Sequence, residues 1–176
     1  EVLSNGTTAL LAFLTRTMQA SSVVTIGTDA GVSALALLEG MSDHGVLTSI
    51  DPDAERQAAA RKVLSLARIR SNQVRLITGT PLDVLPKLRD GAYDMVLING
   101  DRLEYVEYVS QALRLLRTGG IVVVNDALAN NHVADPDNED DDTLIIRETL
   151  DSVLETEEFT PVLLPVGEGL LLATKS

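Results

Sequence analysis

Polar residues follow several apolar runs of this chain, and their types could do chemistry. Carboxylates and amides hold hydroxyl groups or cations, and glycines let a backbone approach a ligand closely. The candidate positions are residues 27–31, Asp51, 79–81, 99–101 and 125–126. The apolar runs, which are predicted as strands, cover residues 23–26, 46–50, 74–77, 93–98 and 121–124. Because an open α/β sheet binds ligands at the carboxyl ends of its strands, we expect these residues to meet at one edge.

The turn at residues 27–31 gives the strongest of these signals. Its glycines are spaced Gly27-x-x-x-Gly31, which differs from the G-x-G-x-x-G spacing of dinucleotide sites. Asp29 brings a negative charge to the position where the second glycine of that motif admits a pyrophosphate. The turn therefore disfavours pyrophosphate and suits a cationic centre, and S-adenosylmethionine joins adenosine to a positive sulfonium. In the alternative interpretation, the glycines serve only the packing of a strand against a helix.

Residues near this turn form the predicted cofactor site. Asp51 lies 24 positions after Gly27, where a carboxylate reaches ribose hydroxyls, whereas Asp53 is better placed to cap the next helix. Thr28 and Ser33 are candidates to hold a methionyl carboxylate; otherwise they are a helix cap and a filler. The complete predicted cofactor-binding set is Gly27, Thr28, Asp29, Gly31, Ser33, Asp51, Thr80, Pro81 and Asn99.

The elements that must position these residues alternate along the chain. Helices are predicted at about residues 7–19, 32–40, 54–67, 83–88, 101–116 and 143–154, with Asp101 and Glu104 spaced as a capping box. Two closing apolar runs, separated only by residues 167–169, predict an antiparallel pair. The predicted fold is α/β: a doubly wound, Rossmann-like, seven-stranded, mostly parallel sheet with an antiparallel C-terminal strand.

Composition narrows the function classes. The 176 residues are expected to form a single domain, and the absence of cysteine excludes disulfides and thiolate catalysis. A net charge of −12 argues against nucleic-acid binding. No apolar run is long enough for a membrane span and no signal peptide is visible, so a cytoplasmic location is expected. The acidic segment 129–142 is predicted as a solvated mobile loop, with an active-site lid as the alternative.

Four segments together resemble one known family. Residues 27–33, 97–102, 115–120 and 164–173 follow the order and spacing of the caffeoyl-CoA/catechol O-methyltransferase-like family. The resemblance covers nearly the whole chain, and an N-terminal segment usual in the family is expected to be missing. It implies an S-adenosylmethionine-dependent enzyme that methylates a hydroxyl of a small molecule. It also implies a homodimer and a divalent cation such as Mg²⁺.

The departures from the family fall at its functional site. The family's first glycine motif reads Glu-x-Gly, and here Thr25 replaces the acid; the other departures fall at the metal site. Carried over position by position, the family's metal ligands become Asn99, Asn125 and Asp126, and its lysine becomes Arg102. One carboxylate and two amides thus replace two carboxylates and one amide, so the affinity for Mg²⁺ is expected to fall. Arg102 stays protonated and cannot be a general base, although it could orient a carboxylate or stabilise a phenolate.

The catalytic candidates follow from these departures. They are Asp126 and Asp101 as bases and Arg102 as a stabilising cation, with His132 as a weaker candidate on a loop. The chain has no tryptophan to clamp a flat ring, so a catechol-like substrate is not implied. An alternative function is a cofactor-binding but catalytically silent regulator or partner protein. A third hypothesis, an NAD-dependent reductase, is disfavoured by Asp29.

Overall fold

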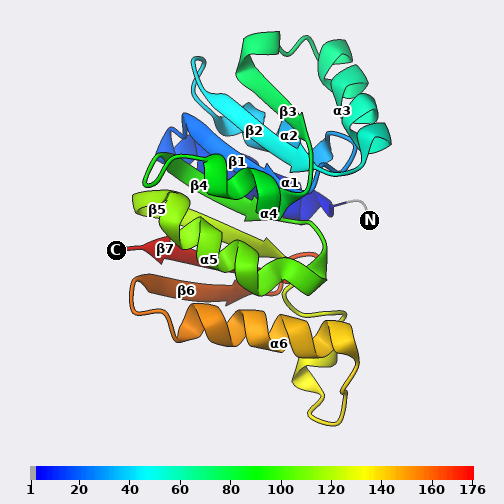
Figure 1. Cartoon of the computed structure of the whole chain (residues 1–176), viewed down its shortest axis with the longest axis vertical. Helices are drawn as coiled ribbons and strands as arrows, with labels where there is room; N and C mark the ends of the chain where they lie inside the picture. Colours follow the sequence, from blue (N-terminus) through cyan, green and yellow to red (C-terminus); the bar gives the residue numbers. More distant parts are fainter. Residues whose placement is uncertain (1–2) are drawn as a thin grey trace.

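A seven-stranded sheet organises the computed structural model, which describes residues 3–176 (Figure 1). The strand order is β3-β2-β1-β4-β5-β7-β6. The first five strands run parallel, and β7 is antiparallel to both of its neighbours. The strands are β1 (Ser22–Ile26), β2 (Val46–Asp51), β3 (Val74–Thr78), β4 (Tyr93–Ile98), β5 (Leu116–Asn125), β6 (Phe159–Leu164) and β7 (Leu170–Lys175). The predicted fold class is confirmed.

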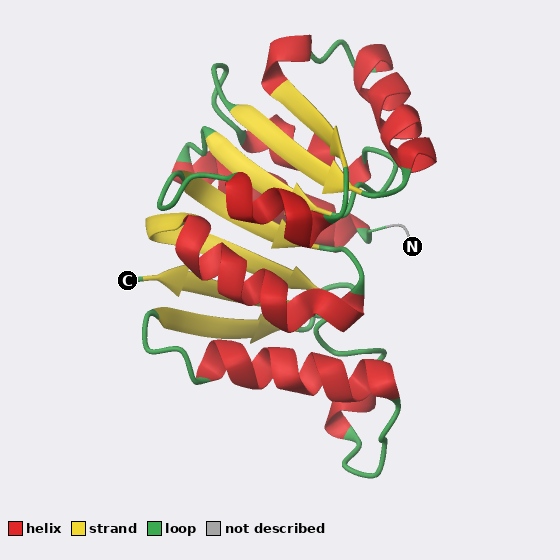
Figure 2. Cartoon of the chain, in the orientation of Figure 1, coloured by secondary structure: helices red, strands yellow, loops and turns green. Residues whose placement is uncertain are grey.

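Helices cover both faces of the sheet, with α4, α5 and α6 in front and α1 and α2 behind in Figure 1; Figure 2 shows the same layers by element type. The helices are α1 (Asn5–Met18), α2 (Val32–Gly40), α3 (Ala54–Leu66), α4 (Pro81–Val84), α5 (Tyr105–Leu115) and α6 (Asp141–Leu154). Ser4 caps α1, because its hydroxyl accepts from the Thr7 backbone N–H at 3.1 Å. Within residues 3–176, no helix combines the length and the apolar character needed to cross a membrane.

Alternating side chains of the central strands divide the core in two. In β4, Val96 and Ile98 belong to the cluster that includes α5 and α6, whereas Met95 and Leu97 belong to the cluster that includes α1 and α2. Successive side chains of a strand point to opposite faces, so a strand covered on both sides reads as a continuous apolar run. This explains why residues 95–98 are all apolar and why they were predictable as part of a buried strand.

The region around α5 differs from the sequence prediction. Strand β5 begins at Leu116 instead of 121, because Thr118-Gly119-Gly120 form an irregularity in the β4–β5 pairing and do not end the helix. The predicted capping box is wrong: Asp101 accepts from the Leu103 N–H at 3.0 Å, but the Glu104 carboxylate accepts from the Tyr108 hydroxyl at 2.6 Å. A 3₁₀ turn over Arg102–Glu104 therefore precedes α5.

Asp94 fastens the amino ends of three strands. Its carboxylate accepts from the backbone N–H groups of Ser21 at 2.7 Å and Ser22 at 3.0 Å, and from the Arg117 guanidinium at 2.6 Å. Burial alone would raise the pKa of Asp94, but the hydrogen bonds from Arg117, Ser21 and Ser22 outweigh it and hold the pKa below its ordinary value. The ionised side chain therefore ties β1, β4 and β5 together.

Replacing Gly40 by alanine should disturb the close packing of α1 against α2. An added methyl group would overlap the Thr15 hydroxyl and the Ala12 carbonyl of α1. We expect Gly40→Ala to lower the free energy of unfolding by about 1–3 kcal/mol, measured by urea denaturation. Gly6→Ala is the control, because its methyl group would meet the movable Val166 side chain at 3.1 Å. Equal stability of the two variants would contradict the tight packing of α1 on α2.

Asp94→Asn should destabilise the chain in a pH-dependent way. Because folding lowers the pKa of Asp94, its stabilising effect is present above the unfolded value of about 3.8 and is lost as the pH falls through the folded value. We expect a loss of about 1–3 kcal/mol at pH 7 and a smaller gap between variant and wild type at pH 3. Urea denaturation at the two pH values measures both. A gap that widens in acid would refute the assigned direction.

Candidate functional site

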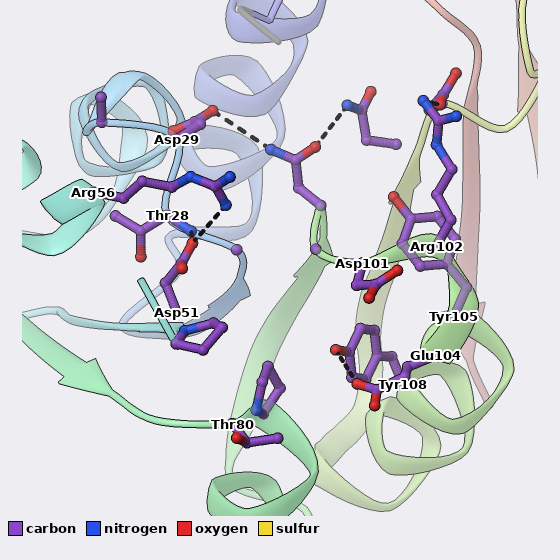
Figure 3. Close-up of a pocket in the computed structure, with 18 residues that line it drawn as sticks. Thr28, Asp29, Asp51, Arg56, Thr80, Asp101, Arg102, Glu104, Tyr105 and Tyr108 are labelled. Carbon is purple, nitrogen blue, oxygen red and sulfur yellow. Dashed lines mark hydrogen bonds and ion pairs between the residues drawn. The ribbon is translucent and has the colours of Figure 1, made fainter. Parts of the chain in front are cut away.

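The carboxyl ends of the parallel strands open into one cavity of about 780 Å³ (Figure 3). Its walls come from the turn after β1, the ends of β2, β4 and β5, the start of α4 and the first turns of α5. The lining residues are Gly27, Thr28, Asp29, Ala30, Asp51, Pro52, Arg56, Thr80, Pro81, Asn99, Gly100, Asp101, Arg102, Glu104, Tyr105, Tyr108, Asn125 and Asp126. The structure thus brings together every predicted site residue except Gly31, Ser33, Gly79 and His132.

Gly27 brings the turn after β1 against the end of β4. Its φ is +94°, and an added Cβ would overlap the backbone carbonyl of Asn99. The Gly27 N–H donates to the Ile50 carbonyl at 2.8 Å, and the Asn99 N–H donates to the Ile26 carbonyl at 2.8 Å. Only glycine fits this conformation and this approach. The turn therefore joins the ends of three strands at the floor of the cavity.

Asp51 is the most deeply buried carboxylate in the cavity lining, with a relative exposure of 1%. One oxygen accepts from the Thr28 N–H at 2.7 Å and lies 3.7 Å from the Arg56 guanidinium, and the other accepts from the Asp53 N–H at 2.8 Å. Asp53, and not Asp51, caps α3, because its carboxylate accepts from the N–H groups of Glu55 and Arg56. A carboxylate at this strand end suits a ribose diol, because each oxygen can accept more than one hydrogen bond.

The turn's remaining polar groups mostly bond one another. Thr28 Oγ1 lies 2.6 Å from Ser49 Oγ, so this hydroxyl is turned toward β2. Ser33 donates to Asp29 through its N–H at 3.0 Å and its hydroxyl at 2.8 Å. Gly31, with φ +99°, packs where a Cβ would stand 3.3 Å from Val63 of α3. Gly31 and Ser33 therefore shape the turn from outside the cavity, while Asp29 lines it.

Five acidic and two basic side chains line the cavity. The acids are Asp29, Asp51, Asp101, Glu104 and Asp126, and the bases are Arg56 and Arg102. This balance suits a ligand that carries a positive centre and disfavours a pyrophosphate. With the buried Asp51 and the close approach at Gly27, the residues present fit S-adenosylmethionine.

Two amides and an ion pair occupy the positions carried over as metal ligands. Asn125 Nδ2 donates to Asn99 Oδ1 at 2.8 Å, and Asn99 Nδ2 lies 3.5 Å from an Asp29 oxygen. Asp126, whose φ is +59°, forms an ion pair with the Arg102 guanidinium. The structure therefore does bring Asn99, Asn125 and Asp126 to one end of the cavity, as the sequence predicted.

This arrangement does not fit a divalent cation. Mg²⁺ prefers several anionic oxygens, whereas one amide oxygen here accepts from the other amide and the single carboxylate faces a guanidinium. Among residues 3–176, no group of three or more His, Cys, Asp or Glu side chains could hold a metal ion.

Glu104 and Tyr108 line the cavity although the sequence analysis did not select them as site residues. Tyr108 is 1% exposed, and burial together with the hydrogen bond to Glu104 raises its pKa above the ordinary value. Its hydroxyl therefore remains a neutral donor. The ring of Tyr105 stands 6.4 Å from that of Tyr108. The spacing of the two tyrosines could have indicated that both face the cavity, since positions i and i+3 share a helix face.

A second cavity of about 370 Å³ adjoins the first at Arg102. The acidic segment walls it, and His132 lies there instead of in the main cavity. Arg147 of α6 donates to the backbone carbonyls of Val133, Asp135 and Asn138. These bonds tie the segment to α6, which begins at Asp141, two residues before its predicted start.

Comparison with known proteins identifies the family. Residues 2–176 match the family model described as O-methyltransferase. A putative O-methyltransferase of Mycobacterium sp. (strain KMS) is 42% identical over 167 residues, covering 95% of this chain and 76% of that protein. A solved structure from Corynebacterium glutamicum has a TM-score of 0.94 and 31% identity, covering 100% of this chain and 83% of that one.

A further solved structure contains a bound cofactor. The O-methyltransferase TomG of Streptomyces achromogenes, in complex with S-adenosylmethionine, has a TM-score of 0.91 and 28% identity, covering 99% of this chain and 82% of that one. The enzyme class expected from the sequence is confirmed at the level of the family. The family model matches nearly the whole chain, and the chain has a cavity at the ends of its parallel strands. The chain therefore belongs to the O-methyltransferase family.

Proposed function

We propose that this chain transfers the methyl group of S-adenosylmethionine to a hydroxyl oxygen of a small molecule, with a divalent-metal site that is altered and weakened. The observation that carries this proposal is a single cavity with two chemically different ends. One end holds the buried carboxylate of Asp51, and the other holds the paired amides Asn99 and Asn125 beside Asp126.

At the cofactor end, Asp51 is proposed to accept the ribose hydroxyls. Its backbone partners Thr28 and Asp53 fix the carboxylate before a ligand arrives, which lowers the cost of ordering the site. Thr80 and Pro81 close the wall at the start of α4 (Figure 3). Asp29 is proposed to lie near the cationic part of the cofactor, since Ser33 holds its carboxylate at the cavity wall.

At the acceptor end, the protein's task is alignment. S-adenosylmethionine supplies an already activated methyl group, so rate depends mainly on holding an oxygen in line with the methyl–sulfur bond. Asp101 lines this end and is proposed to take the proton of an acceptor that binds as a neutral hydroxyl. Asp126 is instead proposed to hold Arg102 in place through their ion pair.

A turnover screen separates this proposal from the silent-protein alternative, which the changed residues at positions 25, 99, 102 and 125 motivate. Binding of S-adenosylhomocysteine would be measured by calorimetry, and methyl transfer to a panel of phenols and hydroxy acids by mass spectrometry, both with and without Mg²⁺. Transfer to any member supports the enzyme. Binding without transfer across the panel supports the silent protein. Homodimer formation and a cytoplasmic location stay predictions, and light scattering tests the former.

Asp51→Ala should weaken cofactor binding. Leaving ribose hydroxyls without their acceptor costs about 1–3 kcal/mol, so we expect the dissociation constant of S-adenosylhomocysteine to rise roughly 5- to 150-fold by calorimetry. Asp53→Ala is the matched control: it removes the cap of α3, two residues away and outside the cavity lining, and should lower stability with the affinity unchanged. An unchanged affinity in Asp51→Ala would move the ribose contact elsewhere.

A further inference from the structure

We propose that Arg102 is the resident cation of the acceptor end, so that this chain needs no divalent metal and selects an acceptor whose oxygen is already ionised, such as an acidic phenol. The inference rests on the proposed methyl transfer and deepens it by naming the preferred acceptor class, from which Asp101 has no proton to remove.

Arg102 lies where the two cavities meet. It belongs to the lining of both, and 29% of its side chain is exposed. Its guanidinium forms an ion pair with Asp126 on one side and lies 3.2 Å from an Asp142 oxygen on the other. The positive charge is therefore held where the linings of the two cavities meet.

A metal ion and this guanidinium compete for the same place. The carboxylate of Asp126, the only anionic member of the carried-over ligand set, is already paired with Arg102. A guanidinium keeps its charge at any ordinary pH, so a dication beside it would be repelled. The hydrogen bond between Asn125 and Asn99 also occupies an oxygen that a metal would require.

The two carboxylates that hold Arg102 differ in exposure. The Asp126 side chain is 7% exposed, whereas that of Asp142 is 59% exposed. An exposed ion pair contributes little, so an acceptor oxyanion that reaches the guanidinium within the main cavity can replace Asp142 there at small cost. Asp126 remains as the buried anchor. A neutral hydroxyl gains less, because it lacks the Coulomb attraction between a full negative charge and the guanidinium.

The methyl transfer that follows balances without a metal. A lone pair of the ionised oxygen forms the new C–O bond, the C–S bond breaks, and sulfur keeps that electron pair. The products are a neutral ether and a neutral thioether, so the charge that Arg102 held on the acceptor disappears. Asp142 can then return to the guanidinium as the product leaves.

Direct binding of Mn²⁺ tests the first half of the proposal without any turnover. Free Mn²⁺ would be followed by electron paramagnetic resonance in the presence of S-adenosylhomocysteine. We expect no binding by wild type up to about 1 mM, and binding by the triple variant Arg102→Ser/Asn99→Asp/Asn125→Asp, which restores the carboxylates and removes the cation. Binding by wild type at this site, abolished in Asp126→Asn, would overturn the proposal.

Binding of 4-nitrophenolate, read from its absorbance, tests the second half. We expect Arg102→Gln to raise the dissociation constant of the phenolate ~30-fold or more and Arg102→Lys to raise it less. The matched control is Arg61→Gln, an exposed arginine of α3 outside both cavities. Calorimetry with S-adenosylhomocysteine should give the same affinity for all variants. No phenolate binding by wild type, or equal binding by Arg102→Gln, would overturn the proposal.

A double variant serves as the control for a loss of stability in Arg102→Gln. Arg102→Gln leaves Asp126 buried without its cation, which can destabilise the chain. The double variant Arg102→Gln/Asp126→Asn removes both charges and should also lose the phenolate while keeping the cofactor. Failure of the whole enzyme proposal has a different signature: no methyl transfer to any acceptor, with the Mn²⁺ and phenolate results standing by themselves.

Discussion

The close approach of the β1 turn to the end of β4 is the constraint on which the site depends. Gly27 has a φ of +94° and leaves no room for a side chain against the Asn99 carbonyl. This contact holds the turn after β1 against the end of β4. It also sets Asn99 beside Asp29 and, through Thr28, sets Asp51 under the turn. The two ends of the cavity are thus positioned by one backbone contact.

The two edges of the sheet use their carboxylates differently. At the amino edge, Asp94 bonds three protein donors and serves only to fasten strands. At the carboxyl edge, Asp51 and Asp126 also bond protein partners but line a cavity. Parallel strands bring their carboxyl ends together where the loops diverge, so polar side chains there can serve ligands instead of the fold.

At the end of the cavity opposite Asp51, the polar side chains pair with one another. The Arg102 guanidinium and the Asp126 carboxylate neutralise each other, and the amides of Asn99 and Asn125 are hydrogen-bonded. An arginine supplies one positive charge in a fixed planar arrangement, whereas a metal supplies two and can polarise a hydroxyl. The proposed preference for an ionised acceptor rests on this difference.

The sequence by itself determined most of the strands and the sheet class, because these follow from local patterns. Continuous apolar runs such as residues 95–98 mark strands buried on both faces, and the distance of Asp51 from Gly27 placed this carboxylate at the end of the next strand. Thr118-Gly119-Gly120 misled the prediction, since glycines allow a sheet irregularity as readily as a helix end. The assigned roles of the site residues remain predictions.

Only the tertiary structure decided which side chains of the site pair with each other. The bonds of Glu104 to Tyr108, Asn125 to Asn99 and Arg102 to Asp126 join side chains whose partners depend on how α5 and β5 meet the sheet. The last two pairs also lie more than 20 positions apart in the sequence, so no local pattern encodes them. Side-chain pairing across a sheet edge depends on packing geometry, and packing geometry arises only when the whole sheet has formed.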